Sequence, residues 1–189
     1  MKKIIALAAA LISCCLYLTA EAQPRAAGLR IGATGFDASY QHSIGNNFVE
    51  AEAGLAFGPI TPGFKATALY NFVFARPAWT DRGSWGLYAG PGLSLGYVSD
   101  RLTYTMLISN EEGMTYRRRI HPVEYGFMMS VAAQIGLEYT FWFPLQLSVD
   151  IRPYFGFHVN GNAHYSSRVG FYNYGMMGFI PTVSARYSF

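Results

Sequence analysis

Apolar and polar residues alternate through the segment 125–158 of this 189-residue chain. In Tyr125–Phe141, and again in Leu145–His158, every second residue is apolar or aromatic. The residues between them are mostly glycine, hydroxyl-bearing, amide or charged. A period of two places successive side chains on opposite faces, so both segments are predicted β-strands joined by a turn at Trp142–Pro144.

The apolar face of these two strands is unusually long. It continues over a whole strand of 17 residues in one case and 14 in the other. The opposite face combines small residues with charges of both signs. Strands of a membrane-spanning β-barrel have this pattern, because one face meets lipid and the other meets a polar interior. The sequence therefore predicts an all-β, transmembrane barrel.

The same alternation recurs along most of the remaining chain. It predicts six further strands: Ala26–Ala33, Phe36–His42, Phe48–Phe57, Phe64–Ala75, Ser84–Val98 and Tyr174–Phe189. Polar or turn-forming residues predict the connections Ile44–Asn47, Gly58–Gly63, Arg76–Gly83, Ser99–Glu124 and Val159–Phe171.

The phase of the alternation flips at Thr34-Gly35. Glycine there permits either a bulge in one long strand or a tight hairpin between two short ones. Barrels of this class have an even number of strands, with short periplasmic turns and longer surface loops. Parity therefore favours the hairpin and an eight-stranded, antiparallel, up-and-down barrel.

Three prolines fall within predicted strands: Pro91, Pro153 and Pro181. Proline has no backbone N–H to donate to a neighbouring strand. We expect a bulge or a broken hydrogen bond at each of them.

Residues 1–22 are predicted to be a cleaved signal peptide, which leaves residues 23–189 as the barrel domain. Lys2-Lys3 precedes an apolar core, and Ala20-Glu21-Ala22 forms a small-x-small cleavage site. The apolar core Ile4–Thr19 is shorter than the ~20 residues of a membrane anchor. Lipoprotein processing at Leu11–Cys14 is the other alternative. Conventional cleavage removes both cysteines, so no disulfide or cysteine metal site is expected.

The amino-acid composition argues against nucleic acid as a partner. Charged residues make up 13% of the chain and aromatic residues 16%, and 14 Lys+Arg face 11 Asp+Glu. No basic stripe of the kind that binds nucleic acid is present in the sequence. The aromatic residues fall near the predicted strand ends, as expected of two girdles at the membrane surfaces.

Several strings resemble a known family: Tyr88–Gly92, Gln134–Tyr139 and Pro144–Pro153. The mature chain resembles small outer-membrane β-barrel proteins of Bacteroidetes and, more distantly, the eight-stranded barrels of outer-membrane proteins X and A. The resemblance implies residence in the outer membrane of a Gram-negative cell. It also implies that the terminal Tyr187 and Phe189 are read by the barrel-assembly machinery, and that surface loops serve adhesion.

The predicted inward face carries nine charged residues: Arg30, Asp37, Glu50, Glu52, Lys65, Glu138, Asp150, Arg152 and Arg186. An eight-stranded barrel is just wide enough for side chains to fill it. Charges withdrawn from water must be paired and hydrogen-bonded. We therefore expect an interlocked polar plug; a narrow gated pore is the alternative.

The sequence also offers weaker candidates for chemistry. His42-Ser43 and the group His158, His164, Ser166 and Ser167 could belong to a lipid A-modifying enzyme, but no acidic residue occurs in Val159–Phe189 to orient a base. Arg117, Arg118 and Arg119 suit lipopolysaccharide phosphates, because arginine forks match phosphate geometry. The nearby Glu111 and Glu112 could bind a divalent cation or pair with these arginines.

These observations together predict a monomeric, non-enzymatic barrel of the cell outer membrane, structural or surface-interacting. Its expected partners are outer-membrane lipid, lipopolysaccharide and, during biogenesis, the assembly machinery. No catalytic residue, cofactor, metal or nucleic acid is predicted.

Overall fold

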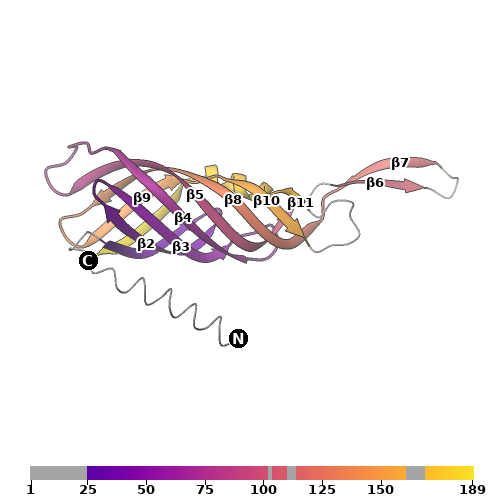
Figure 1. The fold of residues 1–189 in the computed structure, drawn as a ribbon, viewed down its shortest axis with the longest axis horizontal. Coiled ribbons are helices and arrows are strands. Elements are labelled where there is room, and N and C mark those ends of the chain that lie inside the picture. Colours follow the sequence, from indigo (N-terminus) through magenta and orange to yellow (C-terminus); the bar gives the residue numbers. More distant parts are fainter. Residues whose placement is uncertain (1–24, 102–103, 110–113, 161–168) are drawn as a thin grey trace, which may run out of the picture.

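The structure, a computed structural model, describes residues 25–101, 104–109, 114–160 and 169–189. A single antiparallel sheet closes on itself into a barrel (Figure 1), which confirms the predicted eight-stranded architecture. The predicted signal peptide lies outside the described residues. The wall is built from β1 (Arg25–Gly32), β2 (Gly35–Ile44), β3 (Asn47–Ala56), β4 (Gly63–Ala75), β5 (Ser84–Arg101), β8 (Val123–Thr140), β9 (Leu145–Ile151), β10 (Tyr154–Asn160), β11 (Val169–Phe171) and β12 (Thr182–Ser188).

The first and last strands close the barrel. β1 pairs with β12 from Ala26 opposite Ser188 to Ile31 opposite Val183. β9 lies on the other side of β12 and also pairs with β8, which completes the ring β1-β2-β3-β4-β5-β8-β9-β12. Within the described segments, no helix has the length and apolar character required to cross a bilayer.

The hairpin predicted at Thr34-Gly35 is present. β1 and β2 pair without interruption up to Gly32 opposite Gly35. Gly35 has φ 153°, outside the range that side-chain-bearing residues favour. Glycine therefore allows the chain to reverse within two residues, and the two short strands become separate members of the barrel.

Alternation along the strands separates an apolar exterior from a polar interior. On β4, the outward Phe64 and Phe74 are 56% and 60% exposed, whereas the inward Lys65 and Asn71 are 1% and 0% exposed. The same parity holds around the ring, because side chains of a strand alternate across the sheet. The core of this molecule is therefore the polar lumen.

The prediction of a continuous last strand over Tyr174–Phe189 was wrong. Only Thr182–Ser188 is a strand, and Asn173–Phe179 forms a 3₁₀ helix, η1, within the wall. An added Cβ at Gly178 would lie 1.8 Å from the carbonyl oxygen of Arg152 on the neighbouring segment, so glycine is required for η1 to pack this closely. Close backbone contact, which the apolar alternation did not reveal, fixes this segment against β10.

The strand predicted over Leu145–His158 is divided at Arg152-Pro153 into β9 and β10. The N–H of Arg152 donates to the carbonyl of Gly178 at 2.7 Å, while the carbonyl of Pro153 accepts from Ala133 at 3.2 Å. The missing N–H of Pro153 thus coincides with the break, as expected. At Pro91 β5 stays continuous, but its pairing with β4 is interrupted between Leu69–Gly92 and Phe72–Ala89, with the same register on both sides of the gap.

The long surface loops contain more regular structure than was predicted. β5 continues to Arg101 and β8 already begins at Val123, inside the predicted loop Ser99–Glu124. Between them lies a two-stranded ribbon of β6 (Tyr104–Ser109) and β7 (Thr115–Ile120). The predicted loop Val159–Phe171 likewise includes the end of β10 and all of β11.

The two ends of the barrel differ. One end carries the C-terminus and the short turns after β2, β4 and β8; we call it the turn end. At the opposite end the β6–β7 ribbon projects far beyond the barrel along its long axis (Figure 1); we call it the ribbon end.

We expect Gly178→Val to destabilise the barrel, because its side chain would push η1 away from the Arg152 carbonyl. Overpacking of this kind costs about 1–3 kcal/mol. The measurement is urea unfolding of the refolded protein, with Met177→Val as the control because Met177 is 37% exposed in the same helix. Equal stability of both variants would contradict the packing described for Gly178.

Candidate functional site

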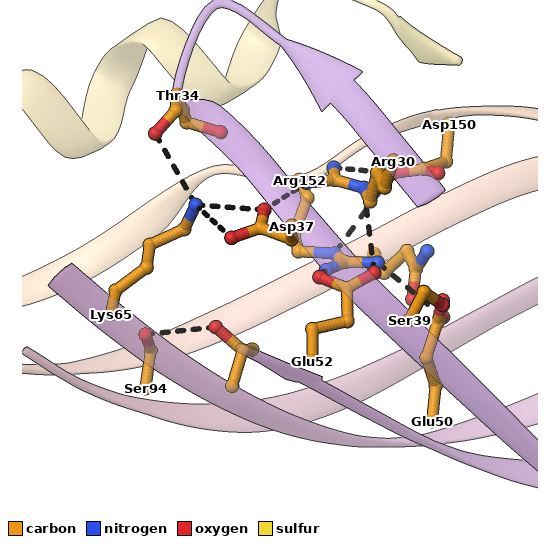
Figure 2. A network of polar contacts seen from close by, with 12 residues as sticks. Arg30, Thr34, Asp37, Ser39, Glu50, Glu52, Lys65, Ser94, Asp150 and Arg152 are labelled. Atoms are coloured by element: carbon orange, nitrogen blue, oxygen red, sulfur yellow. Dashed lines mark hydrogen bonds and ion pairs between the residues drawn. The ribbon is translucent and has the colours of Figure 1, made fainter. Parts of the chain in front are cut away.

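Charged side chains from both halves of the sequence meet inside the barrel (Figure 2). Glu50 of β3 accepts hydrogen bonds from Arg186 of β12 and from Ser39 of β2, the latter at 2.9 Å. Arg186 also donates to Ser39 and to Ser148 of β9, both at 2.8 Å. The Glu50 carboxylate and the Arg186 guanidinium are therefore each held by an ionic partner and by hydroxyl groups.

Arg152 connects opposite sides of the wall. It lies at the junction of β9 and β10 and donates to Glu52 of β3, and its second terminal nitrogen lies 3.4 Å from Glu50 Oε2. β3 and β9 are four positions apart in a ring of eight, so this contact crosses the full width of the lumen. Arg152 is 0% exposed. Its charge is therefore neutralised within the barrel.

A third group of contacts lies around Asp37 of β2. Lys65 Nζ of β4 is 2.9 Å from both oxygens of Asp37 and also donates to the Thr34 carbonyl at 3.3 Å. Arg30 of β1 lies 3.6 Å from Asp37 and donates to Asp150 of β9 at 2.9 Å. Arg30 thereby joins the Asp37 group to the carboxylates that contact Arg152.

Eight of the nine predicted lumen residues form one connected set, which we call the lumen network: Arg30, Asp37, Glu50, Glu52, Lys65, Asp150, Arg152 and Arg186. Four bases face four acids, so the charges balance. Glu138 lies apart, where its carboxylate accepts from Gln146 at 2.6 Å, and Gln146 also donates to Gln41 at 2.9 Å.

Apolar clusters occupy the lumen beside the network. Phe48, Val73 and Tyr88 pack together near the turn ends of their strands. A larger cluster toward the ribbon end consists of Ala56, Leu69, Val98, Met128, Ala132, Tyr154 and Tyr172. A cavity of about 260 Å³ lies at the turn end, and Glu138, Gln41 and Gln146 are among the residues that line it. The lumen therefore has a recess at the turn end and packed side chains beyond it.

Asp100 is an anchor that the sequence interpretation missed. Its two carboxylate oxygens accept from the N–H groups of Asn173 and Tyr174, at 2.7 and 3.0 Å, and so cap the first turn of η1. The sequence interpretation placed Asp100 in a surface loop. Extending the alternation of β5 past Val98 would have placed this carboxylate on the inward face.

The residues proposed for catalysis are not brought together in the described part of the chain. His158 is 0% exposed inside the ribbon-end half of the lumen, with its Nε2 3.0 Å from the Val98 carbonyl oxygen. His42 lies at the turn end, and its ring stacks with Tyr40 at 6.5 Å. His164, Ser166 and Ser167 lie outside the described residues. Among the residues that the structure describes, no group of three potential metal-ligating side chains occurs.

The remaining predicted site residues are exposed. Arg117, Arg118 and Arg119 are solvent-exposed on β7 of the projecting ribbon. Glu111 and Glu112 lie outside the described residues. Tyr187 and Phe189 are 60% and 64% exposed at the turn end. Their recognition by an assembly machinery stays a prediction.

We expect Arg152→Met to lower the free energy of unfolding by about 3–5 kcal/mol, the cost of leaving a buried partner charge uncompensated. Arg118→Met, which removes an exposed guanidinium, should change it little. Glu52→Gln in the Arg152→Met background should restore part of the loss. Urea unfolding followed by intrinsic fluorescence measures all three. Equal stabilities of Arg152→Met and Arg118→Met would show that the cross-lumen contact contributes nothing.

No family model matches the chain, and no curated protein matches it. Among solved structures, the N-terminal β-barrel domain of Pseudomonas aeruginosa OprF is similar, with 13% sequence identity and a TM-score of 0.45. The match covers 88% of this chain and 96% of that domain. The architecture described above therefore rests on the strand pairing of this chain itself.

Proposed function

We propose that this chain is an integral outer-membrane barrel without catalytic activity, which spans the membrane with a closed lumen and presents the β6–β7 ribbon at the cell surface. The observation that carries this proposal is the inverted distribution of side chains. Leu93, Leu95 and Val131 are 61%, 49% and 53% exposed on the outside, whereas Arg30, Glu50 and Arg186 are buried inside. Such an exterior is stable against lipid hydrocarbon.

Closure of the sheet supports a membrane-spanning role. In hydrocarbon an unpaired backbone N–H or C=O costs several kcal/mol, so open sheet edges are not tolerated there. Among the described residues, the ring of eight strands leaves no such edge in the half of the barrel nearer the turn end, because β1 pairs with β12 and β2, and β9 pairs with β12 and β8. β4, β5 and β8 contain 13, 18 and 18 residues, enough for the ~9–11 residues that a spanning strand needs.

The connections indicate the orientation. Barrels of this type have short periplasmic turns and longer extracellular loops. We therefore place the turn end in the periplasm and the ribbon end outside the cell. This orientation is part of the proposal, and it puts the exposed Arg117–Arg119 on the external side.

The lumen network supports a closed interior over the pore alternative. Arg152 bridges the lumen to Glu50 and Glu52, and the Tyr154 and Tyr172 side chains pack in the half nearer the ribbon. Charges held by several partners in low dielectric do not exchange readily with passing ions. The lumen network is thus best explained as a structural brace.

The test is reconstitution of the mature chain into phospholipid vesicles and planar bilayers. Added trypsin should cut the ribbon at Arg117–Arg119 and leave the barrel protected, and planar bilayers should show no conductance. Complete digestion would refute membrane insertion. Discrete conductance steps that change when Glu50 or Arg186 is neutralised would instead establish the pore alternative.

The ribbon is the feature best placed to contact other molecules. Arg117 and Arg119 alternate with Arg118, so one face presents two guanidinium groups and the opposite face presents one. Arg119 precedes the start of β8 at Val123 by four residues, or about 14 Å of extended chain. We therefore propose that these arginines bind anionic groups on the sugar core of lipopolysaccharide, beyond the phosphates at the membrane surface.

Replacing Arg117, Arg118 and Arg119 together by glutamine should weaken binding of the inserted protein to purified lipopolysaccharide about tenfold or more, because charge-assisted arginine forks are lost. The matched triple lysine variant keeps the charge and should retain part of the affinity. Surface plasmon resonance at two salt concentrations measures both. Unchanged binding by the glutamine variant would show that the ribbon is not the contact surface.

A further inference from the structure

A continuous group of aromatic rings covers one side of the turn end. We define the turn-end aromatic patch as Trp79, Trp85, Tyr139, Phe141, Trp142 and Phe143. Successive ring centroids are 5.5 Å apart for Trp79–Trp85, 4.6 Å for Trp85–Tyr139 and for Tyr139–Phe141, and 4.9 Å for Phe141–Phe143. The chain has three tryptophans, and all of them belong to this patch.

The turn between β4 and β5 lies against the outside of the barrel. The indole N–H of Trp85 donates to the Thr80 hydroxyl at 3.2 Å, and the Tyr139 hydroxyl donates to the Arg82 carbonyl at 2.7 Å. Trp85 and Tyr139 are register partners on β5 and β8, at outward positions. The turn is thereby fixed beside the outer wall, and it presents its side chains next to the apolar exterior.

A cation is held within this patch. The Arg82 guanidinium carbon lies 5.9 Å from the centre of the Trp142 ring, within range of a cation–π contact. Trp79 and Trp142 beside it are 61% and 66% exposed. The turn 76–83 contains Arg76 and Arg82 against Asp81 alone, a net charge of +1. The patch therefore combines large apolar rings with an available positive charge.

The position of the patch on the barrel indicates which kind of molecule contacts it. On β5 the outward Trp85 lies two residues before the outward Leu87, and on β8 the outward Tyr139 lies two residues after the outward Leu137. The aromatic rings therefore begin where the apolar exterior of the barrel ends. Tryptophan and tyrosine favour the boundary between hydrocarbon and water, since their rings are apolar with a polar end. In an inserted barrel, a soluble protein could reach these rings only by displacing lipid. A lipid head group reaches them without displacing anything.

We propose that the turn-end aromatic patch is a binding site for a phospholipid with an anionic head group. Arg82 pairs with the phosphate, and the neighbouring rings cover the glycerol and the first carbons of the acyl chains. The inference rests on the proposed membrane-spanning function, because only an inserted barrel brings lipid to this surface. It names a specific lipid contact on one side of the rim, in addition to the general preference of aromatic residues for membrane surfaces.

The first measurement uses tryptophan fluorescence, which reports on the patch alone because it contains every tryptophan of the chain. The full mature chain is inserted into vesicles of phosphatidylcholine brominated either near the head group or near the chain ends. We expect stronger quenching by the bromine near the head group. Quenching by aqueous acrylamide without any effect of brominated lipid would overturn the proposal, because the patch would then face water.

The second measurement tests the cation. Vesicles of phosphatidylcholine with a minor share of phosphatidylglycerol are extracted with mild detergent, and the lipid retained by the protein is identified by native mass spectrometry. Wild type should retain phosphatidylglycerol selectively, and Arg82→Gln should retain several-fold less. Arg76→Gln is the matched control, because it removes the same charge from the same turn on the side where Arg76 donates to Asn46.

Two results would overturn the site. Equal retention of phosphatidylglycerol by wild type and Arg82→Gln would show that Arg82 does not bind the lipid. Equal losses of phosphatidylglycerol in Arg82→Gln and Arg76→Gln would show that only the general surface charge matters. Trypsin protection of the barrel is measured on the same vesicles. Protection without selective retention refutes only this site, whereas a lack of protection refutes the membrane-spanning function and with it the lipid site.

Discussion

The structure depends on neutralising eight buried charges within a closed wall. Each strand that carries a charge inward loses the solvation of that group, and the loss is offset only if partners arrive from other strands. Arg152 shows the requirement most clearly, since two of its three carboxylate partners, Glu50 and Glu52, come from β3 on the far side of the ring. The strands must therefore adopt one register and one order for the charges to meet.

The register that pairs the inward charges also determines which side chains face outward. A slip of one residue in any strand would turn its charges toward the apolar exterior and its large apolar groups inward. Lys65 and Phe64 are neighbours in sequence, yet one is 1% and the other 56% exposed. The polar interior and the apolar exterior therefore favour the same register between neighbouring strands. The two faces of each strand reinforce one arrangement.

Much of this was predictable from periodicity, because a period of two determines which side chains point the same way. The shared inward face of the charged residues follows from it directly, whereas the hairpin at Thr34-Gly35 and the count of eight strands also required the rule that such barrels have an even number of strands. The ion-pair partners in the lumen could not be predicted, because alternation gives no distances between side chains on different strands. Glu138 illustrates this limit: it has the same inward phase as Glu50 but contacts amides rather than arginines. The η1 segment was mispredicted for a related reason, because its position depends on contact with the Arg152 backbone.

The seam between β1 and β12 joins segments more than 150 residues apart in the chain, from Arg25 to Phe189. Contacts of such long range form late, because the chain entropy of closing a loop must be lost before they contribute. Arg30 and Arg186 lie on the two strands of this seam, so Arg30 reaches Asp150 of β9, and Arg186 reaches Glu50 of β3, only as the circle closes. An incomplete barrel would carry charges without their ionic partners. Partly assembled intermediates are therefore costly, and completion of the wall becomes a cooperative event that completes the ion pairs and the last hydrogen-bonded ladder together.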